Sequence, residues 1–282
     1  MIDWPTPEEW KELLPGMRGK VGTIDKTSTA YHQEDNALIF AQKITDGLFG
    51  KLRKAKGCLF VVGAEHAERF EKIEGRSAME YTENPRYRYA EILGMLDDRI
   101  TPEPAQIHPT AVVMEGAVIH DGVTIGANSV IGNNAVIGGQ GFGFALDDDR
   151  PPLRIRHLGG VNIGEGVEVG ALSTVCAGTI TPTTIGDHCK IDDHVHVAHN
   201  VQMGEQCIIT GCVEISGSVT IGDKAWLGPN CAIRNGLSIG AGALVGVGAA
   251  VLKSVPDGVT VAGNPARQLP ASARRMPTRT NG

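Results

Sequence analysis

An aliphatic residue recurs at every sixth position over much of the chain between Ile107 and Val251. The first run ends at Ile137, and after an interruption the period resumes at Ile163, slips by four residues after Val175, and continues from Ile185 to Val251. A period of six fits neither a helix of 3.6 residues per turn nor the two-residue alternation of a flat strand. It is typical of hexapeptide β-solenoids, in which three hexapeptides close one coil of about 18 residues.

A second small or apolar side chain follows four positions after most of these residues, as at Ala117, Cys189 and Cys207. One coil cannot bury its apolar edge alone, so the coils must stack at the spacing of neighbouring strands and share one core. The sequence therefore predicts a mainly β fold, a parallel β-helix over residues 105–262.

The preceding residues, 1–104, alternate short apolar runs with helical patterns, which predicts a small α/β domain. Strands are expected at 37–42 and 58–62, and helices at 46–55, 64–73 and 85–96. Thr6 and Pro7 can begin a short helix near the start. Residues 263–282 form a polar C-terminal tail that we expect to be partly disordered or to form a short helix.

Composition excludes several classes of function. The formal net charge of −6 and the absence of a basic run argue against a nucleic-acid polymer or an anionic membrane as the main partner. No apolar run has the length of a membrane-spanning helix, and the first residues do not resemble a signal peptide, so a cytoplasmic location is expected. The six cysteines include no Cys-x-x-Cys pair, which disfavours a structural zinc site.

The period is interrupted over residues 138–162, which contain a Gly-Phe-Gly-Phe-Ala run, three consecutive aspartates and a Pro-Pro pair. Irregular segments that leave a rigid scaffold often carry ligand contacts, which makes Phe142 and Phe144 candidate substrate-binding residues. The alternative is a tolerated insertion without a role in binding.

Histidine supplies the clearest candidate for chemistry. His199 lies two residues beyond the inward-facing Val197, so it is expected to point outward near a corner, and Gly217 lies one coil of 18 residues later. A histidine beside a backbone N–H without a side chain is the minimum for acyl transfer, because the imidazole can accept a proton and the N–H can stabilise an oxyanion. An ordinary surface histidine is the alternative.

Four stretches together resemble the LpxD-type acyltransferases, which N-acylate a UDP-linked glucosamine in lipid A biosynthesis: residues 84–90, 107–111, 141–145 and 190–200. The resemblance covers the chain from about residue 35 to 255. It implies a left-handed β-helix, a homotrimer with active sites between subunits, and an N-terminal domain that holds the uracil of a nucleotide sugar. It further implies that His199 is the general base and that Gly217 donates its N–H. Asp192, His196 and Asn200, in the same stretch as His199, are candidate substrate contacts.

The chain departs from this family in three places. Asn235 to Leu237 stand where the family has a second histidine, and residues 42–49 replace its uracil-stacking segment, so Phe40 and Phe49 become the candidate base contacts. The exit over residues 262–267 is similar to that of CoA-dependent hexapeptide acetyltransferases. The expected donor is therefore acetyl-CoA or another short acyl-CoA, the expected acceptor is the amine of a nucleotide-linked amino sugar in lipopolysaccharide or glycan biosynthesis, and Lys253, Gly263 and Arg267 are candidate cofactor contacts.

Three alternatives remain open at this point. One is a lipid A pathway N-acyltransferase that uses an acyl carrier protein. Another is a zinc enzyme like the γ-class carbonic anhydrases, because His194 and His199 have a His-x4-His spacing; the third ligand would fall near His157, which is out of register, so no metal is expected. The last is a non-enzymatic assembly solenoid.

Overall fold

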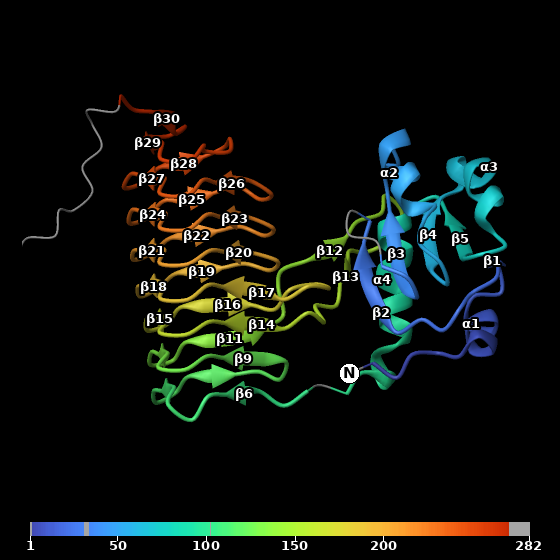
Figure 1. Cartoon of the computed structure of the whole chain (residues 1–282), viewed down its shortest axis with the longest axis horizontal. Helices are drawn as coiled ribbons and strands as arrows, with labels where there is room; N and C mark the ends of the chain where they lie inside the picture. Colours follow the sequence, from blue (N-terminus) through green and yellow to red (C-terminus); the bar gives the residue numbers. More distant parts are fainter. Residues whose placement is uncertain (1, 31–33, 102, 271–282) are drawn as a thin grey trace, which may run out of the picture. The chain divides into compact units, whose positions relative to one another are not determined.

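The computed structural model describes residues 2–30, 34–101 and 103–270, and the chain divides into two compact units (Figure 1). The first comprises Met1–Pro102 together with Gly143–Arg156, and the second comprises Glu103–Phe142 and His157–Gly282. Residues 143–156 were expected to belong to the β-helix domain. The structure groups them with the N-terminal unit because they pack against a helix of that unit.

The first unit is built on a five-stranded sheet with the order β1-β5-β4-β3-β2. The strands are β1 (Arg18–Gly19), β2 (Lys26–Thr29), β3 (Ala37–Ala41), β4 (Leu59–Gly63) and β5 (Ala78–Thr82). Strands β2 to β5 run parallel to one another, and β1 pairs antiparallel with β5. Every residue of β4 is buried, as expected for a central parallel strand covered on both faces.

The α-helices of this unit are α1 (Pro7–Leu13), α2 (Asp46–Leu52), α3 (Ala67–Phe70) and α4 (Pro85–Met95), and the 3₁₀ turns are η1 (Ala64–His66), η2 (Glu71–Ile73) and η3 (Asp97–Arg99). Thr6 caps α1 in a capping box with Glu9, which confirms the predicted start. The segment predicted as a helix over 64–73 is helical along its whole length, but it is divided into three pieces. The segment is η1, α3 and η2, because bonds to the third preceding carbonyl tighten it at Ala67 and Glu74.

The segment predicted to be irregular contains an ordered antiparallel hairpin of β12 (Phe144–Ala145) and β13 (Leu153–Arg154). Its apolar side packs on α4, where Tyr87, Ala90, Ala145 and Ile155 form a buried cluster. The Tyr87 hydroxyl donates to the Pro151 carbonyl at 3.1 Å. The hairpin is therefore held by side chains from a helix more than fifty residues earlier in the sequence.

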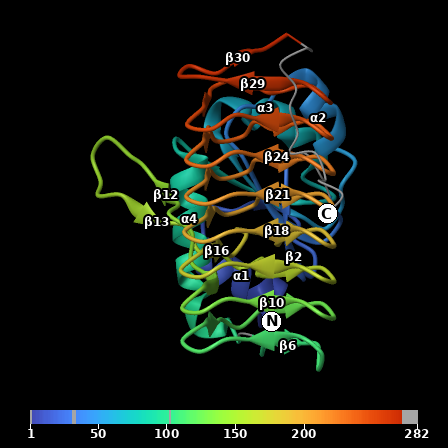
Figure 2. The ribbon, with the colours of Figure 1, turned by 90° about the vertical axis from the view of Figure 1, so that its left-hand side faces the viewer.

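The second unit consists of three parallel sheets whose strands follow one another around successive coils (Figures 1 and 2). The first sheet contains β6 (Gln106–Ile107), β9 (Val123–Ile125), β14 (Val161–Ile163), β17 (Thr183–Ile185), β20 (Gln202–Met203), β23 (Thr220–Ile221) and β26 (Ser238–Ile239). We call its outer surface face C.

The second sheet contains β7 (Val112–Val113), β10 (Val130–Ile131), β15 (Glu168–Val169), β18 (Lys190–Ile191), β21 (Ile208–Ile209), β24 (Trp226–Leu227), β27 (Leu244–Val245), β29 (Thr260–Ala262) and the antiparallel β30 (Arg267–Gln268). The third contains β8 (Val118–Ile119), β11 (Val136–Gly139), β16 (Thr174–Cys176), β19 (His196–Val197), β22 (Glu214–Ile215), β25 (Ala232–Ile233) and β28 (Ala250–Val251). Their outer surfaces are faces D and E.

The residues that recur with the six-residue period form the hydrophobic core of this unit. The aliphatic residues from Val123 onward point inward and form one buried cluster, together with the small residues four positions later. Cys189, Cys207 and Cys231 are among these small residues, and each is at most 1% exposed. Buried thiols of this kind behave as small hydrophobic side chains. The predicted parallel β-helix is confirmed.

The C-terminal tail begins as a strand: β30 pairs with β29, and the Leu269 N–H donates to the Thr260 carbonyl at 2.8 Å. Residues 271–282, which include Arg274, Arg275 and Arg279, lie outside the described residues, so the predicted disorder or helix there is not tested. Among the described residues, no helix has the length and apolar character to cross a membrane.

Candidate active site

Three separate parts of the second unit meet around His199, at the corner between faces E and C. His199 follows β19, Gly217 follows β22 one coil later, and Gly141 with His157 comes from the two ends of the interruption in the period. The predicted neighbourhood of His199 and Gly217 is present in the structure. The contacts of Gly141 and His157 with His199 were not predicted.

The His199 ring lies against two glycines. A Cβ atom at Gly217 would be 2.6 Å from His199 Cε1 and 2.7 Å from Nε2, and one at Gly141 would be 2.9 Å from His199 Cβ and 3.0 Å from Cδ2. Distances this short leave no room for a side chain at either position. The imidazole therefore requires glycine on both sides. The sequence predicted only that His199 points outward near a corner, whereas in the structure its ring lies between two glycines.

Asn200 determines which nitrogen of His199 carries the proton. The Asn200 Oδ1 atom accepts from the Thr179 N–H at 3.1 Å and from the Thr179 hydroxyl at 2.8 Å, and it lies 2.9 Å from His199 Nδ1. A backbone N–H can only donate, so the side-chain atom facing it is the oxygen. Nδ1 must then carry hydrogen to bond to the same oxygen, which makes Nε2, beside Gly217, the proton acceptor.

Thr179 reaches Asn200 because the two breaks in the period lie together. The slip after Val175 forms a loop over residues 177–182, and the returning end of the first interruption pairs with it: the Leu158 N–H donates to the Thr179 carbonyl at 2.9 Å. Asn200 itself has a φ of 62°, a left-handed conformation that asparagine tolerates better than most residues. Asn200 thus acts on His199 in this structure, although the sequence suggested it as a substrate contact.

The peptide around Gly217 is fixed by its neighbours. The Gly217 carbonyl accepts from the Gly236 N–H at 3.0 Å and from the Asn235 side-chain amide, and the Ser218 N–H donates to the His199 carbonyl at 2.9 Å. Asn235 begins the stretch from Asn235 to Leu237 that was singled out from the sequence as a departure from the resembling family. In this structure the Asn235 side chain binds the Gly217 carbonyl, which belongs to the preceding coil.

The cysteine nearest in register to this corner is Cys176, which pairs with Gly139. Burial raises the pKa of the Cys176 thiol to about 11. A thiol is a nucleophile as its thiolate, so Cys176 is unsuited to forming an acyl-enzyme at neutral pH.

His196, a predicted substrate contact, lies on face E, where its Nδ1 is 2.6 Å from the Thr174 hydroxyl. Phe142 is 87% exposed and directly follows Gly141. Both side chains are reachable by a molecule bound near the corner. His194, the other histidine of the zinc spacing, lies in an exposed turn.

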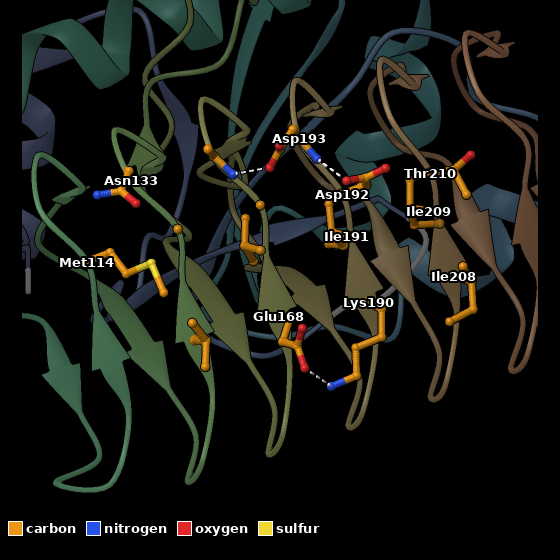
Figure 3. Close-up of a pocket in the computed structure, with 15 residues that line it drawn as sticks. Met114, Asn133, Glu168, Lys190, Ile191, Asp192, Asp193, Ile208, Ile209 and Thr210 are labelled. Carbon is orange, nitrogen blue, oxygen red and sulfur yellow. Dashed lines mark hydrogen bonds and ion pairs between the residues drawn. The ribbon is translucent and has the colours of Figure 1, made fainter. Parts of the chain in front are cut away.

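Asp192, also predicted to bind substrate, lies at a different corner, between faces D and E. It lines a groove of about 530 Å³ with Lys190, Asp193 and Thr210 (Figure 3). The Asp192 carboxylate accepts from the Asp193 N–H at 2.9 Å, and Lys190 pairs with Glu168 at 2.8 Å. The structure does not bring Asp192 beside His199.

The predicted aromatic contacts Phe144, Phe40 and Phe49 belong to the first unit. The Arg154 guanidinium lies 4.6 Å from the centre of the Phe144 ring within the hairpin. Phe40 contacts Tyr89 of α4 at 4.6 Å, whereas Phe49 packs edge-on against Phe70 at 5.2 Å. Phe49 packs against the core cluster that contains Ile39, and Phe40, one residue later in β3, points to the opposite face of the sheet. Phe40 and Phe49 therefore cannot enclose one base between them.

The predicted cofactor contacts lie toward the C-terminal end of the β-helix. The pairing of Ile233 with Val251 places Lys253 one coil beyond Asn235, in the row that begins with His199 and Gly217. The Gly263 carbonyl accepts from the Ala250 N–H at 3.0 Å, which places Gly263 above β28. Lys253 and Arg267 are both exposed.

Metal binding finds no support in the side chains that the structure describes. Among residues 2–30, 34–101 and 103–270, no group of three or more His, Cys, Asp or Glu is arranged to hold a metal ion. His157 does lie beside His199, but a tetrahedral catalytic zinc requires a third protein ligand.

Comparison with known proteins agrees with the repeat and the fold. The bacterial transferase hexapeptide family (six repeats) matches residues 104–139 and 182–217, and the second match contains both His199 and Gly217. The UDP-3-O-acylglucosamine N-acyltransferases of Ectopseudomonas mendocina and Leptospira biflexa are 43% and 46% identical over 67 residues. Each match covers 24% of this chain and 19% of the relative, so the similarity spans about a fifth of the length of these relatives.

Among solved structures, the UDP-N-acetylglucosamine acyltransferase LpxA of Bacteroides fragilis superimposes with a TM-score of 0.50 and 21% identity. The superposition covers 60% of this chain and 74% of that protein. At this identity the likeness concerns the fold. The predicted class, a left-handed parallel β-helix of hexapeptide repeats with a small N-terminal α/β domain, is confirmed.

Proposed function

Since the chain carries bacterial transferase hexapeptide repeats on a left-handed β-helix, we propose that it is an N-acyltransferase acting on a nucleotide-linked amino sugar. The observation that carries the proposal is that the His199 ring lies directly beside Gly217, with the proton-accepting Nε2 among the ring atoms nearest to it. The names of the partial relatives support an acyl acceptor of the nucleotide-sugar class.

In the proposed step the sugar amine attacks the carbonyl carbon of a thioester. The C–N bond forms as the carbonyl electrons move to oxygen, His199 Nε2 takes one proton from the nitrogen, and the Gly217 N–H donates to the oxyanion. Collapse of this intermediate breaks the C–S bond, and the proton on His199 passes to the departing thiolate. The products are an amide and a free thiol, so the step needs neither a metal nor a covalent enzyme intermediate.

The two groups together account for a large rate effect. A general base contributes typically about 10²–10⁴-fold, and one oxyanion donor about 10²–10³-fold. Asn200 contributes indirectly, because the hydrogen bond from Nδ1 keeps the basic nitrogen on the Gly217 side.

For the donor we propose acetyl-CoA or another short acyl-CoA lying along the corner above His199. Lys253 is three coils from His199 in the same row, about 14 Å at the usual strand spacing. Arg267 lies on β30, at the C-terminal end of the sheet of face D. Exposed cations at that distance suit the phosphates of a donor whose thioester reaches His199. An acyl carrier protein is the alternative donor for the same site.

We also propose a homotrimer, because the outward residues of face D are mostly apolar. They are Val112, Val130, Glu168, Lys190, Ile208, Trp226 and Leu244, whereas face C carries Gln106, Thr124, Asn162, Thr184, Gln202, Thr220 and Ser238. An apolar ladder on one side of a prism favours contact with another subunit.

The test is a screen of nucleotide amino sugars against acetyl-CoA, longer acyl-CoAs and acyl carrier protein thioesters, read by mass spectrometry. We expect an N-acylated sugar, and His199→Ala should lower kcat by about 10²-fold or more. His194→Asn, in the exposed turn of the same coil, is the matched control and should retain activity. Chelator treatment should leave the rate unchanged. Near-full kcat in His199→Ala would contradict the assignment of the base.

A further inference from the structure

His157 has no part in the proposed chemistry, yet its imidazole meets the proposed base. His157 is 3% exposed as a residue, and its ring lies edge-to-face with that of His199, with the ring centroids 4.9 Å apart. We propose that His157 is a positioning residue that fixes the orientation of the His199 ring during acyl transfer. This inference rests on the proposed function of His199.

His157 is itself held in place through hydrogen bonds from its backbone to the side chain of Gln140. The Gln140 side chain accepts from the His157 N–H at 2.9 Å and donates to the His157 carbonyl at 3.0 Å, so both ends of one amide bind one residue. The His157 ring also lies against Gly141, where a Cβ atom would be 2.7 Å from Nε2. Gln140 and Gly141 thus anchor His157 within the same stretch of chain that contacts His199.

The His199 ring needs such a contact. The torsion that turns an imidazole about its Cβ–Cγ bond has a broad preference, so the single hydrogen bond from Nδ1 to Asn200 does not by itself fix the orientation of the ring. The glycines on either side make room for the ring but offer no side chain to hold it. The edge-to-face contact with His157 supplies a directional attraction between two rings. Because a displacement of about 1 Å at a reacting group can cost about 10²-fold in rate, this contact bears on kcat.

The proposal is tested by removing and restoring the ring at position 157. His157→Ala should lower kcat by about 10–10²-fold, while KM for both substrates stays within about twofold. His157→Phe, which keeps a ring, should recover most of the loss. If that variant does not fold, 4-methylimidazole added to His157→Ala supplies the ring instead. A loss in His157→Ala that neither ring restores would overturn the proposal.

A second measurement does not depend on turnover. In protein labelled with ¹⁵N-histidine, the His199 ring resonances are identified by their absence from His199→Gln. The unsubstituted protein should show one tautomer, protonated at Nδ1, and His157→Ala should bring the two nitrogen shifts closer together. Unchanged shifts and unchanged kcat in His157→Ala would reject a positioning role. If the protein acylates no acceptor but His157→Ala still changes the shifts, the proposed function fails while the contact between the rings stands.

Discussion

Gly217 lies where the His199 ring leaves no space for a side chain, so a single methyl group tests the geometry of the site. In Gly217→Ala the new Cβ would start 2.6 Å from His199 Cε1, and the ring must move. We expect kcat to fall by about 10²-fold, as for a misplaced catalytic group. The matched control is Gly211→Ala, whose Cβ would meet its nearest neighbour, the Asp192 carboxylate, at 3.3 Å. Equal activity in the two variants, measured at saturating substrates, would show that His199 tolerates displacement.

Asn200 allows the hydrogen bond to be separated from the backbone conformation. Asn200→Gly keeps the positive φ but removes the acceptor, so His199 loses its preference for the Nδ1 proton, and kcat should fall by about tenfold or more. Asn200→Asp keeps an oxygen for His199 and both Thr179 donors, so it should be closer to the natural chain. Steady-state kinetics of the two variants decide the matter. If Asn200→Gly were the more active, the tautomer argument would be wrong.

Single residues also show what a sequence can and cannot predict. The neighbourhood of His199 and Gly217 follows from counting one coil of 18 residues within an unbroken repeat. The position of His157 cannot be found by counting coils, because His157 follows an insertion into the repeat. The length of an insertion does not indicate where the chain rejoins the β-helix. The signal that could have found it is the second break near Thr179: two interruptions of one period close in sequence can face each other.

At the level of elements, the β12–β13 hairpin depends on charges as well as on its apolar side. Arg150 pairs with Asp147 at 2.7 Å and with Glu91 of α4 at 3.0 Å, and its guanidinium lies 3.8 Å from the centre of the Tyr87 ring. The sequence predicted an excursion here but not a hairpin, since two short paired segments have little strand signal of their own. Contacts with α4 order them.

The ion pair gives the hairpin a defined pH dependence. The hydrogen bond from Arg150 lowers the pKa of Asp147 to about 2 from an ordinary 3.8. A lowered carboxyl pKa stabilises the folded state above pH 4, and this contribution is lost as the pH falls from about 4 toward 2. Asp147→Asn should remove it already at pH 7, seen as faster amide hydrogen exchange in residues 143–156 with unchanged exchange in the β-helix. Arg18 and Glu71 offer a control, because they form an exposed pair at 3.9 Å elsewhere in the first unit. Glu71→Gln should not alter exchange in the hairpin.

For the whole molecule, the difference between faces C and D makes the proposed trimer testable with two similar substitutions. Trp226→Glu places a charge on the apolar ladder of face D, and Thr220→Glu places the same charge on face C, where its neighbours are already polar. We expect the first to shift the mass in analytical ultracentrifugation at micromolar concentration from trimer toward monomer, and the second to leave it unchanged. A monomer in the natural chain would contradict both the assembly and a site shared between subunits.

The β-helix itself was predictable because its core repeats. The inward positions of all coils lie in the same buried environment, so the same residue types recur there and every coil strengthens the pattern. The arrangement of side chains in the first unit was less predictable from the sequence. Phe40 and Phe49 looked equivalent in sequence, but the alternation along β3 sends Phe40 to the side of α4, opposite to the core against which Phe49 packs.

The row from His199 through Gly217 and Asn235 to Lys253 advances by whole coils, because each pair of strands along it is in register. A distance built in this way cannot be adjusted gradually. Loss or gain of 18 residues would move Lys253 toward or away from His199 by one strand spacing, about 4.8 Å, while every inward residue kept its neighbours. The β-helix therefore sets the distance between these residues in steps of one coil. Under the proposed function, a donor of different length would require a chain with one coil more or one coil fewer.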